Sequence, residues 1–265
     1  MKPGIAGIVA AIAVVVFFSD PTAIHAQRGR GAAQTAAGRG ARATAPADLS
    51  GHWVAVVSED WKYRMITPPK GEYGSVPLSP EGRKIADTWD AAKDEVAGTQ
   101  CKAYGAAGIM RIPGRLRFSW ENDDTLRIDT DAGTQTRLLY FGAPPPATPG
   151  AELTWQGRSV AQWQTAAGRG PRFADTNLSE RGGFMKVVTT QMRPGYLRKN
   201  GVPYGTNAVM TEYFESHEAP GGERYLVVST VIEDPQHLSQ PYVTSTNFRK
   251  LPDASGWNPT PCTTK

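Results

Sequence analysis

The chain has 265 residues and a formal net charge of +4, from 29 lysine and arginine residues against 25 aspartate and glutamate residues. Lys2 and Asp20 cancel near the N-terminus, so after residue 47 the chain holds 24 cations and 24 anions. A body of zero net charge gives no support to a nucleic-acid-binding face on the domain. The excess charge lies in residues 27–47 and consists of four arginines: Arg28, Arg30, Arg39 and Arg42.

The N-terminus predicts a cleaved secretory signal. Lys2 precedes an apolar run of 14 residues, 5–18, and a polar and small-residue stretch that ends at Ala26. This order of segments is typical of export signals, and cleavage is expected after Ala26. An uncleaved anchor is the weaker alternative, because a membrane-spanning helix needs roughly 20 apolar residues. We therefore expect an exported protein that acts in the periplasm or outside the cell.

Residues 27–47 are predicted to be a flexible tether. They are almost entirely Ala, Gly, Gln, Thr and Arg, without an aromatic or large aliphatic side chain. Such a segment buries too little apolar surface to offset the entropy of ordering it. Its arginines would give weak association with anionic envelope surfaces.

Residues 48–265 are expected to form one domain, because no second low-complexity break divides them. The domain contains two cysteines, Cys101 and Cys262. In an oxidising compartment such a pair is more often bridged than free, although the sequence leaves both states open.

The pattern along this body is that of a sheet protein with one insertion. Residues 59–110, rich in proline, glycine and charge, are expected to lie over one barrel mouth, with a single helix over residues 80–95 that begins after Ser79. The remainder of that insertion is expected to be loop. Alternation and turn residues predict strands over residues 49–58, 115–121, 125–131, 135–141, 159–165, 184–193, 208–216, 225–233 and 242–250.

These strands predict an all-β fold. No helix is long enough for a βαβ crossover, which excludes a doubly wound sheet and leaves a barrel or a sandwich. We expect an antiparallel barrel of roughly 8–10 strands, since closure removes exposed strand edges.

The turn Asn122-Asp123-Asp124 predicts the register of one hairpin. One face would then carry an apolar ladder and the other a solvated face of paired charges. The expected apolar pairs are Phe118 with Ile128 and Trp120 with Leu126, and the charged pairs are Arg117 with Asp129 and Arg115 with Asp131.

The tripeptide Gly51-His52-Trp53 resembles the Gly-x-Trp signature that opens lipocalin-like barrels. In that family the tryptophan plugs one end of the barrel, and a basic residue after the last strand packs on it. Arg249 or Lys250 occupies the corresponding place here. The insertion before Met110 departs from the compact lipocalin plan.

Residues from about 48 to 262 also resemble a family of secreted, largely uncharacterised proteins of soil bacteria. This resemblance implies the fold and the export, and it implies no reaction, because none is assigned to that family. The residues that carry it are Glu59-Asp60-Trp61, Pro68-Pro69-Lys70-Gly71, Leu197-Arg198-Lys199-Asn200-Gly201-Val202-Pro203-Tyr204, Thr211-Glu212-Tyr213-Phe214, Glu233-Asp234-Pro235 and Gln240-Pro241-Tyr242.

Most catalytic templates are absent from the sequence, including the serine-nucleophile elbow, the phosphate-binding loop and the dinucleotide fingerprint. His52, His217 and His237 are the histidines that remain after the signal, and none has metal-ligand spacing. We expect no metal, no cofactor and no nucleic-acid partner. The sequence leaves the oligomeric state open.

Two carboxylates are the candidates for acid–base chemistry. Glu212 shares one strand face with Met210 and Phe214, and burial there would raise its pKa toward the range of a general acid or base. The alternatives are that the opposite face points inward, or that an arginine pairs with Glu212. Asp234, before Pro235, would lie at a barrel mouth, where it is equally well explained as a turn residue.

A second set of residues is predicted to bind ligand at a barrel mouth. They offer aromatic walls and cations that could clamp an anionic or carbonyl group. They are Trp61, Tyr63, Arg64, Arg198, Lys199, Tyr204 and Tyr242.

Three functions follow from these observations. The first is a barrel that binds a small, largely apolar ligand. The second is a barrel enzyme of the isomerase, cyclase or lyase type, with Glu212 or Asp234 as the base. The third is an envelope interaction module whose lumen is filled by its own side chains.

Overall fold

A computed structural model describes Met1 and residues 40–146, 150–165 and 183–264. Residues 2–26 of the predicted signal and residues 27–39 of the predicted tether lie outside this part of the chain. The compact unit spans Gly40–Lys265. Its first residues contact the barrel, since the Ala41 amide donates to Asp124 Oδ1 at 2.8 Å and the Trp163 indole donates to the Ala41 carbonyl at 2.8 Å.

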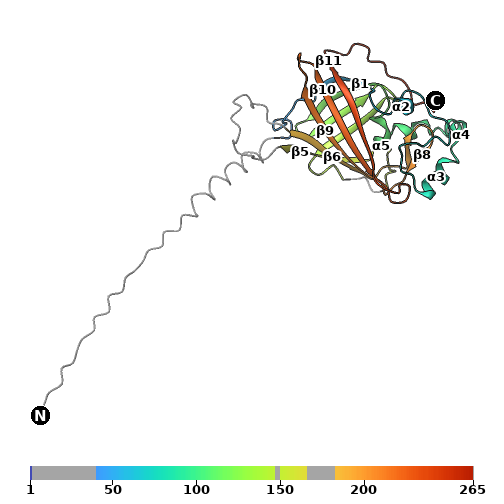
Figure 1. Cartoon of the computed structure of the whole chain (residues 1–265). Coiled ribbons are helices and arrows are strands. Elements are labelled where there is room, and N and C mark those ends of the chain that lie inside the picture. The colour runs from blue at the N-terminus through green and yellow to red at the C-terminus, as the bar shows by residue number, and fades with distance from the viewer. Residues whose placement is uncertain (2–39, 147–149, 166–182, 265) are drawn as a thin grey trace. The chain divides into compact units, whose positions relative to one another are not determined.

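The body is a closed barrel of nine strands, in the order β1-β11-β10-β9-β6-β5-β4-β3-β2 (Figure 1). Each predicted strand is present, with ends that differ from the prediction by at most three residues. The strands are β1 (Gly51–Val56), β2 (Arg115–Asn122), β3 (Thr125–Thr130), β4 (Gln135–Phe141), β5 (Arg158–Thr165), β6 (Gly183–Thr190), β9 (Val209–Glu218), β10 (Arg224–Glu233) and β11 (Tyr242–Leu251).

The barrel is mixed, so the expectation of a purely antiparallel sheet is wrong. Strands β4 and β5 are parallel, with Leu139 opposite Ser159 and Phe141 opposite Ala161. Parallel neighbours require a connection that returns the chain to the end where the first strand began. The residues between Phe141 and Arg158 supply it, and Thr154 near the end of this segment bridges Met192.

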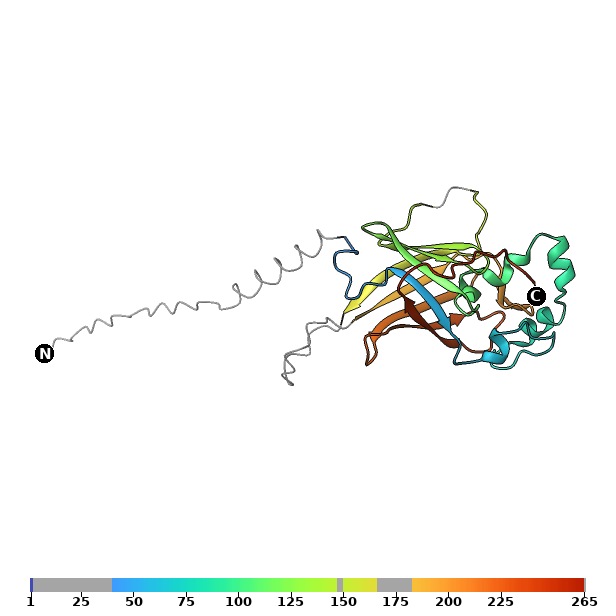
Figure 2. The same cartoon turned by 90° about the horizontal axis from the view of Figure 1, so that it is seen from above.

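Short elements gather at one end of the barrel, as Figure 1 and Figure 2 show. They come from residues 57–113 and 191–208, which we call the cap. A small sheet of two strands belongs to it. The cap elements are α2 (Trp61–Arg64), α3 (Pro80–Ala86), α4 (Ala91–Val96), η1 (Gln100–Tyr104), α5 (Ala106–Ile109), β7 (Gly195–Arg198) and β8 (Val202–Tyr204).

The single helix expected over residues 80–95 is two helices, α3 and α4. Ser79 Oγ caps α3 by accepting from the Gly82 amide at 3.0 Å, as predicted. Asp90 then starts α4 with a cap of its own, at 3.0 Å from the Ala92 amide. Between the helices Trp89 packs against Gly201 so closely that a Cβ at position 201 would overlap the tryptophan Cβ. Tertiary packing therefore interrupts the helical pattern. The expectation of loop elsewhere in the insertion missed α2, η1 and α5.

The barrel interior is layered along the strands. Apolar side chains fill one part, including Trp53, Phe118 and Phe214, each at most 1% exposed. A second apolar cluster joins the barrel to the cap. Along β9, Met210 belongs to the cap cluster and Phe214 to the barrel cluster, and Glu212 lies between them. Other strands also place a buried polar residue beside the apolar residues of the barrel cluster. Together these residues form a polar layer: Arg137, Ser159, Thr189, Glu212, Thr230 and Thr246.

Trp53 is fully buried in the barrel cluster. Its indole donates to the Leu49 carbonyl at 2.9 Å, and Lys250 Nζ lies 5.4 Å from its ring centroid. Lys250, rather than Arg249, is therefore the basic residue of the last strand that packs on this tryptophan. Gly51 adopts a φ of 106°, a conformation that side chains disfavour.

The predicted hairpin register is confirmed. Phe118 pairs with Ile128, Trp120 with Leu126 and Arg117 with Asp129, although a bulge before Asn122 shortens the turn. Asp129 is only 6% exposed, so this carboxylate is not the solvated group expected on the outer face. Arg117, Arg127 and Thr136 all donate to it, at 2.7–3.2 Å.

Asp129→Asn is expected to reduce the dependence of the free energy of unfolding on pH in the acid range. Burial opposes ionisation of Asp129, but hydrogen bonds from Thr136, Arg117 and Arg127 outweigh it and lower the pKa below the ordinary 3.8. A lowered folded-state pKa adds stability above the unfolded-state pKa, and this is lost as the pH falls through the folded-state value. Urea unfolding of the variant should show reduced stability at pH 7 and a smaller loss below pH 3.8. Asp123→Asn, at the exposed turn, is the control; an equal change in both variants would contradict the prediction.

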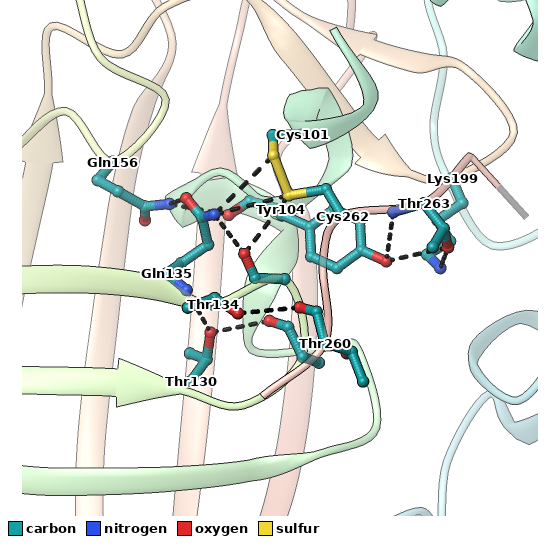
Figure 3. Close-up of a disulfide and its surroundings, with 12 residues drawn as sticks. Cys101, Tyr104, Thr130, Thr134, Gln135, Gln156, Lys199, Thr260, Cys262 and Thr263 are labelled. Carbon is teal, nitrogen blue, oxygen red and sulfur yellow. Dashed lines mark hydrogen bonds between the residues drawn. A yellow bond between two sulfur atoms is a disulfide. The ribbon is translucent and has the colours of Figure 1, made fainter. Parts of the chain in front are cut away.

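A disulfide joins Cys101 in η1 to Cys262 in the C-terminal segment. Gln135 lies beside it, with Nε2 at 3.6 Å from Cys262 Sγ and 2.6 Å from the Gly133 carbonyl oxygen (Figure 3). Thr263, which follows Cys262 in the sequence, donates its backbone amide to Tyr104 Oη at 3.2 Å. The bridge thus ties the C-terminal segment to the cap.

Candidate functional site

A groove of about 740 Å³ opens in the cap. This volume is in the usual range of small-molecule sites. The residues that line it come from α2 and the segment after it, from the start of α4, from η1 and α5, and from β7 and its turn. Its apolar wall includes Met65, Ile66, Pro68, Trp89, Ile112 and Leu197.

The rim of the groove exposes large apolar side chains. Met65 is 58% and Ile66 64% exposed, and Trp61, a few residues earlier, is 67% exposed. Single exposed apolar side chains are ordinary, whereas large contiguous apolar patches are typical of interaction sites.

Three arginines from distant parts of the sequence form a cluster at the groove. Arg64 donates from Nε to the Arg111 carbonyl at 2.9 Å, and its Nη1 pairs with Glu59. Arg111 Nη2 donates to Asp60 Oδ2 at 2.8 Å. Arg198 Nη2 lies 3.8 Å from the same carboxylate oxygen, and its guanidinium carbon lies 4.4 Å from the Tyr63 ring centroid. We call Arg64, Arg111 and Arg198 the arginine cluster.

The backbone around the cluster is held in an uncommon conformation. Asp60 has a φ of 48° and Ser75 a φ of 65°, both in the left-handed region that non-glycine residues seldom adopt. Their side chains meet, with Ser75 Oγ 3.3 Å from Asp60 Oδ2, and Arg198 Nη2 donates to that hydroxyl at 2.6 Å. Strained residues of this kind concentrate at functional sites.

The cluster carries excess positive charge. Three guanidinium groups face two carboxylates, those of Glu59 and Asp60, and no acidic residue is among the described residues that line the groove. Burial, together with the charge of Arg111, lowers the pKa of Arg64. An arginine remains protonated in proteins, so the desolvated charge persists.

The C-terminal segment completes one wall. Thr264 lines the groove, and its hydroxyl donates to Glu95 Oε1 at 2.5 Å. Lys199 adds a fourth cation to the lining; its Nζ donates to Thr263 Oγ1 at 3.2 Å and lies 5.0 Å from the Tyr104 ring centroid (Figure 3).

The structure brings four of the predicted ligand-binding residues together around the groove: Tyr63, Arg64, Arg198 and Lys199. Trp61 is exposed on the same helix, α2, and is not among the lining residues. Tyr204 and Tyr242 lie elsewhere, 1% and 3% exposed in the cap cluster. Burial raises the pKa of Tyr204 well above the ordinary tyrosine value. Ligand contact by any of the seven stays a prediction.

Glu212 points into the barrel, on the Met210–Phe214 face. It is fully buried and pairs with Arg137, whose two terminal nitrogens donate to the two carboxylate oxygens at 3.1 and 2.6 Å. Arg137 Nη2 also lies 3.4 Å from Thr189 Oγ1, which bonds Ser159 Oγ at 2.8 Å. The arginine partner, one of the alternatives left open by the sequence, is therefore present.

Asp234 follows β10 and is 2% exposed. Its Oδ2 accepts from the Gly205 amide at 2.7 Å and lies 2.8 Å from His237 Nδ1. Its Oδ1 accepts from the Gln236 amide at 3.2 Å. These contacts are those of a residue that organises a turn and joins it to β8.

Sequence reasoning missed Arg111, Arg137 and His237. The inward orientation of Arg137 could have been predicted, because Arg137 and Leu139 are two residues apart on a predicted strand and therefore face the same side of the sheet. Arg111 and His237 lie in irregular segments, where no periodicity assigns a side chain to a face.

The comparisons with known proteins give no further guide: no protein-family model, no curated protein and no solved structure matches the chain. Over the described residues, no three or more His, Cys, Asp or Glu side chains are grouped as a metal site. Within the same residues, no helix has the length and apolar character needed to cross a bilayer.

Proposed function

We propose that the protein is an exported binding protein that holds a small, largely apolar ligand in the groove of the cap. The observation that carries this proposal is the groove itself, an apolar hollow of about 740 Å³ with a cationic edge. A small number of charged groups in an otherwise apolar hollow is the usual composition of a small-molecule site. The barrel interior, which is filled by its own side chains, serves as the scaffold.

The lipocalin-like character of the scaffold is part of the proposal. The contact between Lys250 and Trp53 supports it. Export is supported by the predicted signal and by the Cys101–Cys262 disulfide, since disulfides persist mainly in oxidising compartments. The basic residues 27–47 would then keep the protein near anionic envelope surfaces.

Acid–base catalysis is the weaker candidate. Glu212 is paired with Arg137, and Asp234 is hydrogen-bonded to its own turn and to Gly205. Neither carboxylate is among the residues that line the groove, so neither lies where it would meet a ligand bound there. A Glu212→Gln variant that kept full turnover on an identified substrate would remove Glu212 as the base.

Ala91→Trp is expected to block binding. Ala91 lines the groove at the start of α4, so an indole there would occupy the ligand volume. Binding would be measured by fluorescence titration with N-phenyl-1-naphthylamine, an uncharged apolar probe. We expect saturable binding to the unmodified protein and at least a tenfold weaker affinity in the variant.

Ala92→Trp is the matched control, because Ala92 is exposed on the same helix and does not line the groove. It should bind the probe as the unmodified protein does. Equal binding by the Ala91 and Ala92 variants would show that the probe binds elsewhere and would overturn the proposal.

A further inference from the structure

We infer that the ligand of the groove is an amphipathic anion, and that the arginine cluster receives its charged group. This inference rests on the proposed function, because it assigns a chemical class to the ligand of that groove. Three features of the cluster carry it: its charge balance, its unsatisfied donors and its geometry.

The charge balance favours an anion. Among the residues that the structure describes, Arg64, Arg111 and Arg198 are opposed by Glu59 and Asp60, which leaves one positive charge of the cluster without a described counter-charge. The side chains of Arg64 and Arg198 are 1% and 3% exposed, so water screens this charge poorly. A buried cation without a counter-charge is unfavourable, and a bound anion removes that penalty.

Two donors of the cluster have no acceptor among the described residues. Arg64 Nη2 and Arg198 Nε are buried and make no hydrogen bond within the part of the chain that the structure describes. The other nitrogens of these guanidinium groups are used: Arg198 donates to the Gly74 carbonyl and to Ser75 Oγ, both at 2.6 Å. Buried polar groups are nearly always paired, so each such donor calls for a partner.

The geometry specifies the class of anion. A guanidinium group presents its N–H groups in a planar fork that matches carboxylate and phosphate oxygens, and several arginines together favour such groups over a simple hydroxyl. Met65, Ile66 and Leu197 line the same groove and would contact an apolar body. A carboxylate, phosphate or sulfonate on a short hydrocarbon chain combines both requirements.

The test compares four small molecules on the exported full-length protein by isothermal titration calorimetry at pH 7.5. Octanoate has the chain and the anion, octan-1-ol has the chain alone, octylammonium reverses the charge, and acetate has the anion without the chain. We expect octanoate to bind at least tenfold more tightly than octan-1-ol, and octylammonium and acetate to bind more weakly than either.

Each contrary result has a distinct meaning. Equal affinities for octanoate and octan-1-ol would overturn this inference and leave the proposed function standing. Acetate binding as tightly as octanoate would overturn the apolar-ligand function and leave the anion site standing. No binding of any of the four would count against both.

Arg64→Met assigns the effect to the cluster. We expect it to remove the preference for octanoate over octan-1-ol, measured as the ratio of the two affinities, and we expect Arg64→Lys to retain part of the preference. Lys70→Met is the matched control, because Lys70 is an exposed cation of the same region that does not line the groove. A preference retained in Arg64→Met would overturn the assignment. If Arg64→Met fails to fold, the ligand series on the unmodified protein decides.

Discussion

Arg137→Met is expected to destabilise the barrel by about 3–5 kcal/mol, the cost of leaving one partner of a buried ion pair uncompensated. Arg137 is 1% exposed and its partner Glu212 is fully buried, so neither charge regains water when the other is removed. The pair also connects to Thr189 and, through it, to Ser159. Glu212→Met should cost a similar amount. The free energy of unfolding in urea measures both effects.

The double variant Arg137→Met/Glu212→Met distinguishes the net contribution of the ion pair from the cost of leaving one buried charge without its partner. Replacing a buried ion pair by apolar side chains of similar volume is often neutral or stabilising. We therefore expect it to recover most of the stability lost in each single variant. Arg249→Met is the surface control, because Arg249 and Glu223 are 3.5 Å apart with about half of each side chain exposed, and exposed pairs contribute roughly 0–1 kcal/mol. A loss in Arg137→Met no larger than in this control would disprove the prediction.

The barrel strands were predictable because each one is a local pattern. Alternation within β9 put Met210, Glu212 and Phe214 on one face, and the buried face is that one. The hairpin register followed from a short turn and complementary charges, as the pairing of Arg117 with Asp129 confirms. In both cases the information lies within one short, continuous stretch of sequence.

The parallel pair and the cap were not predictable in that way. The partner of β5 depends on where the connection after Phe141 returns the chain, and no local pattern encodes that path. The cap elements are short: α2 has 4 residues and β8 has 3. Such pieces are stabilised by tertiary contacts rather than by a periodic apolar face.

The candidate site shows both situations. The sequence analysis selected cationic and aromatic residues in two segments that it expected at a barrel mouth. The groove brings four of them together: Tyr63, Arg64, Arg198 and Lys199. The sequence analysis did not select Arg111. Its role becomes clear only in the structure, where Arg111 and Arg198 both interact with the Asp60 carboxylate. The three arginines come from segments that are distant in the sequence and meet only in the folded chain. The excess positive charge of the arginine cluster therefore could not be predicted from the sequence.

Removing the disulfide should have the largest effect on stability. The bridge joins residues 161 positions apart, and in the loop-entropy model closing such a loop restricts the unfolded chain by roughly 5 kcal/mol. For a domain of this size, a loss of that order lowers the melting temperature by about 10–20 °C. Calorimetry of Cys101→Ser/Cys262→Ser, or of the unmodified protein with a reductant, would measure it. A shift below about 3 °C would contradict the prediction, and the reductant should have no effect on the double variant.

The same variant should also weaken ligand binding in the groove. The bridge at Cys262 holds Thr263 against Tyr104 and places Thr264 in the groove wall. Without it, the segment retains hydrogen bonds such as that from the Thr260 amide to the Asp131 carbonyl at 2.9 Å, but its last residues lose their covalent anchor. Affinity for N-phenyl-1-naphthylamine should therefore fall at a temperature at which the double variant is still folded. Unchanged affinity there would show that the apolar wall from Met65 to Pro69 forms the site without the C-terminal segment.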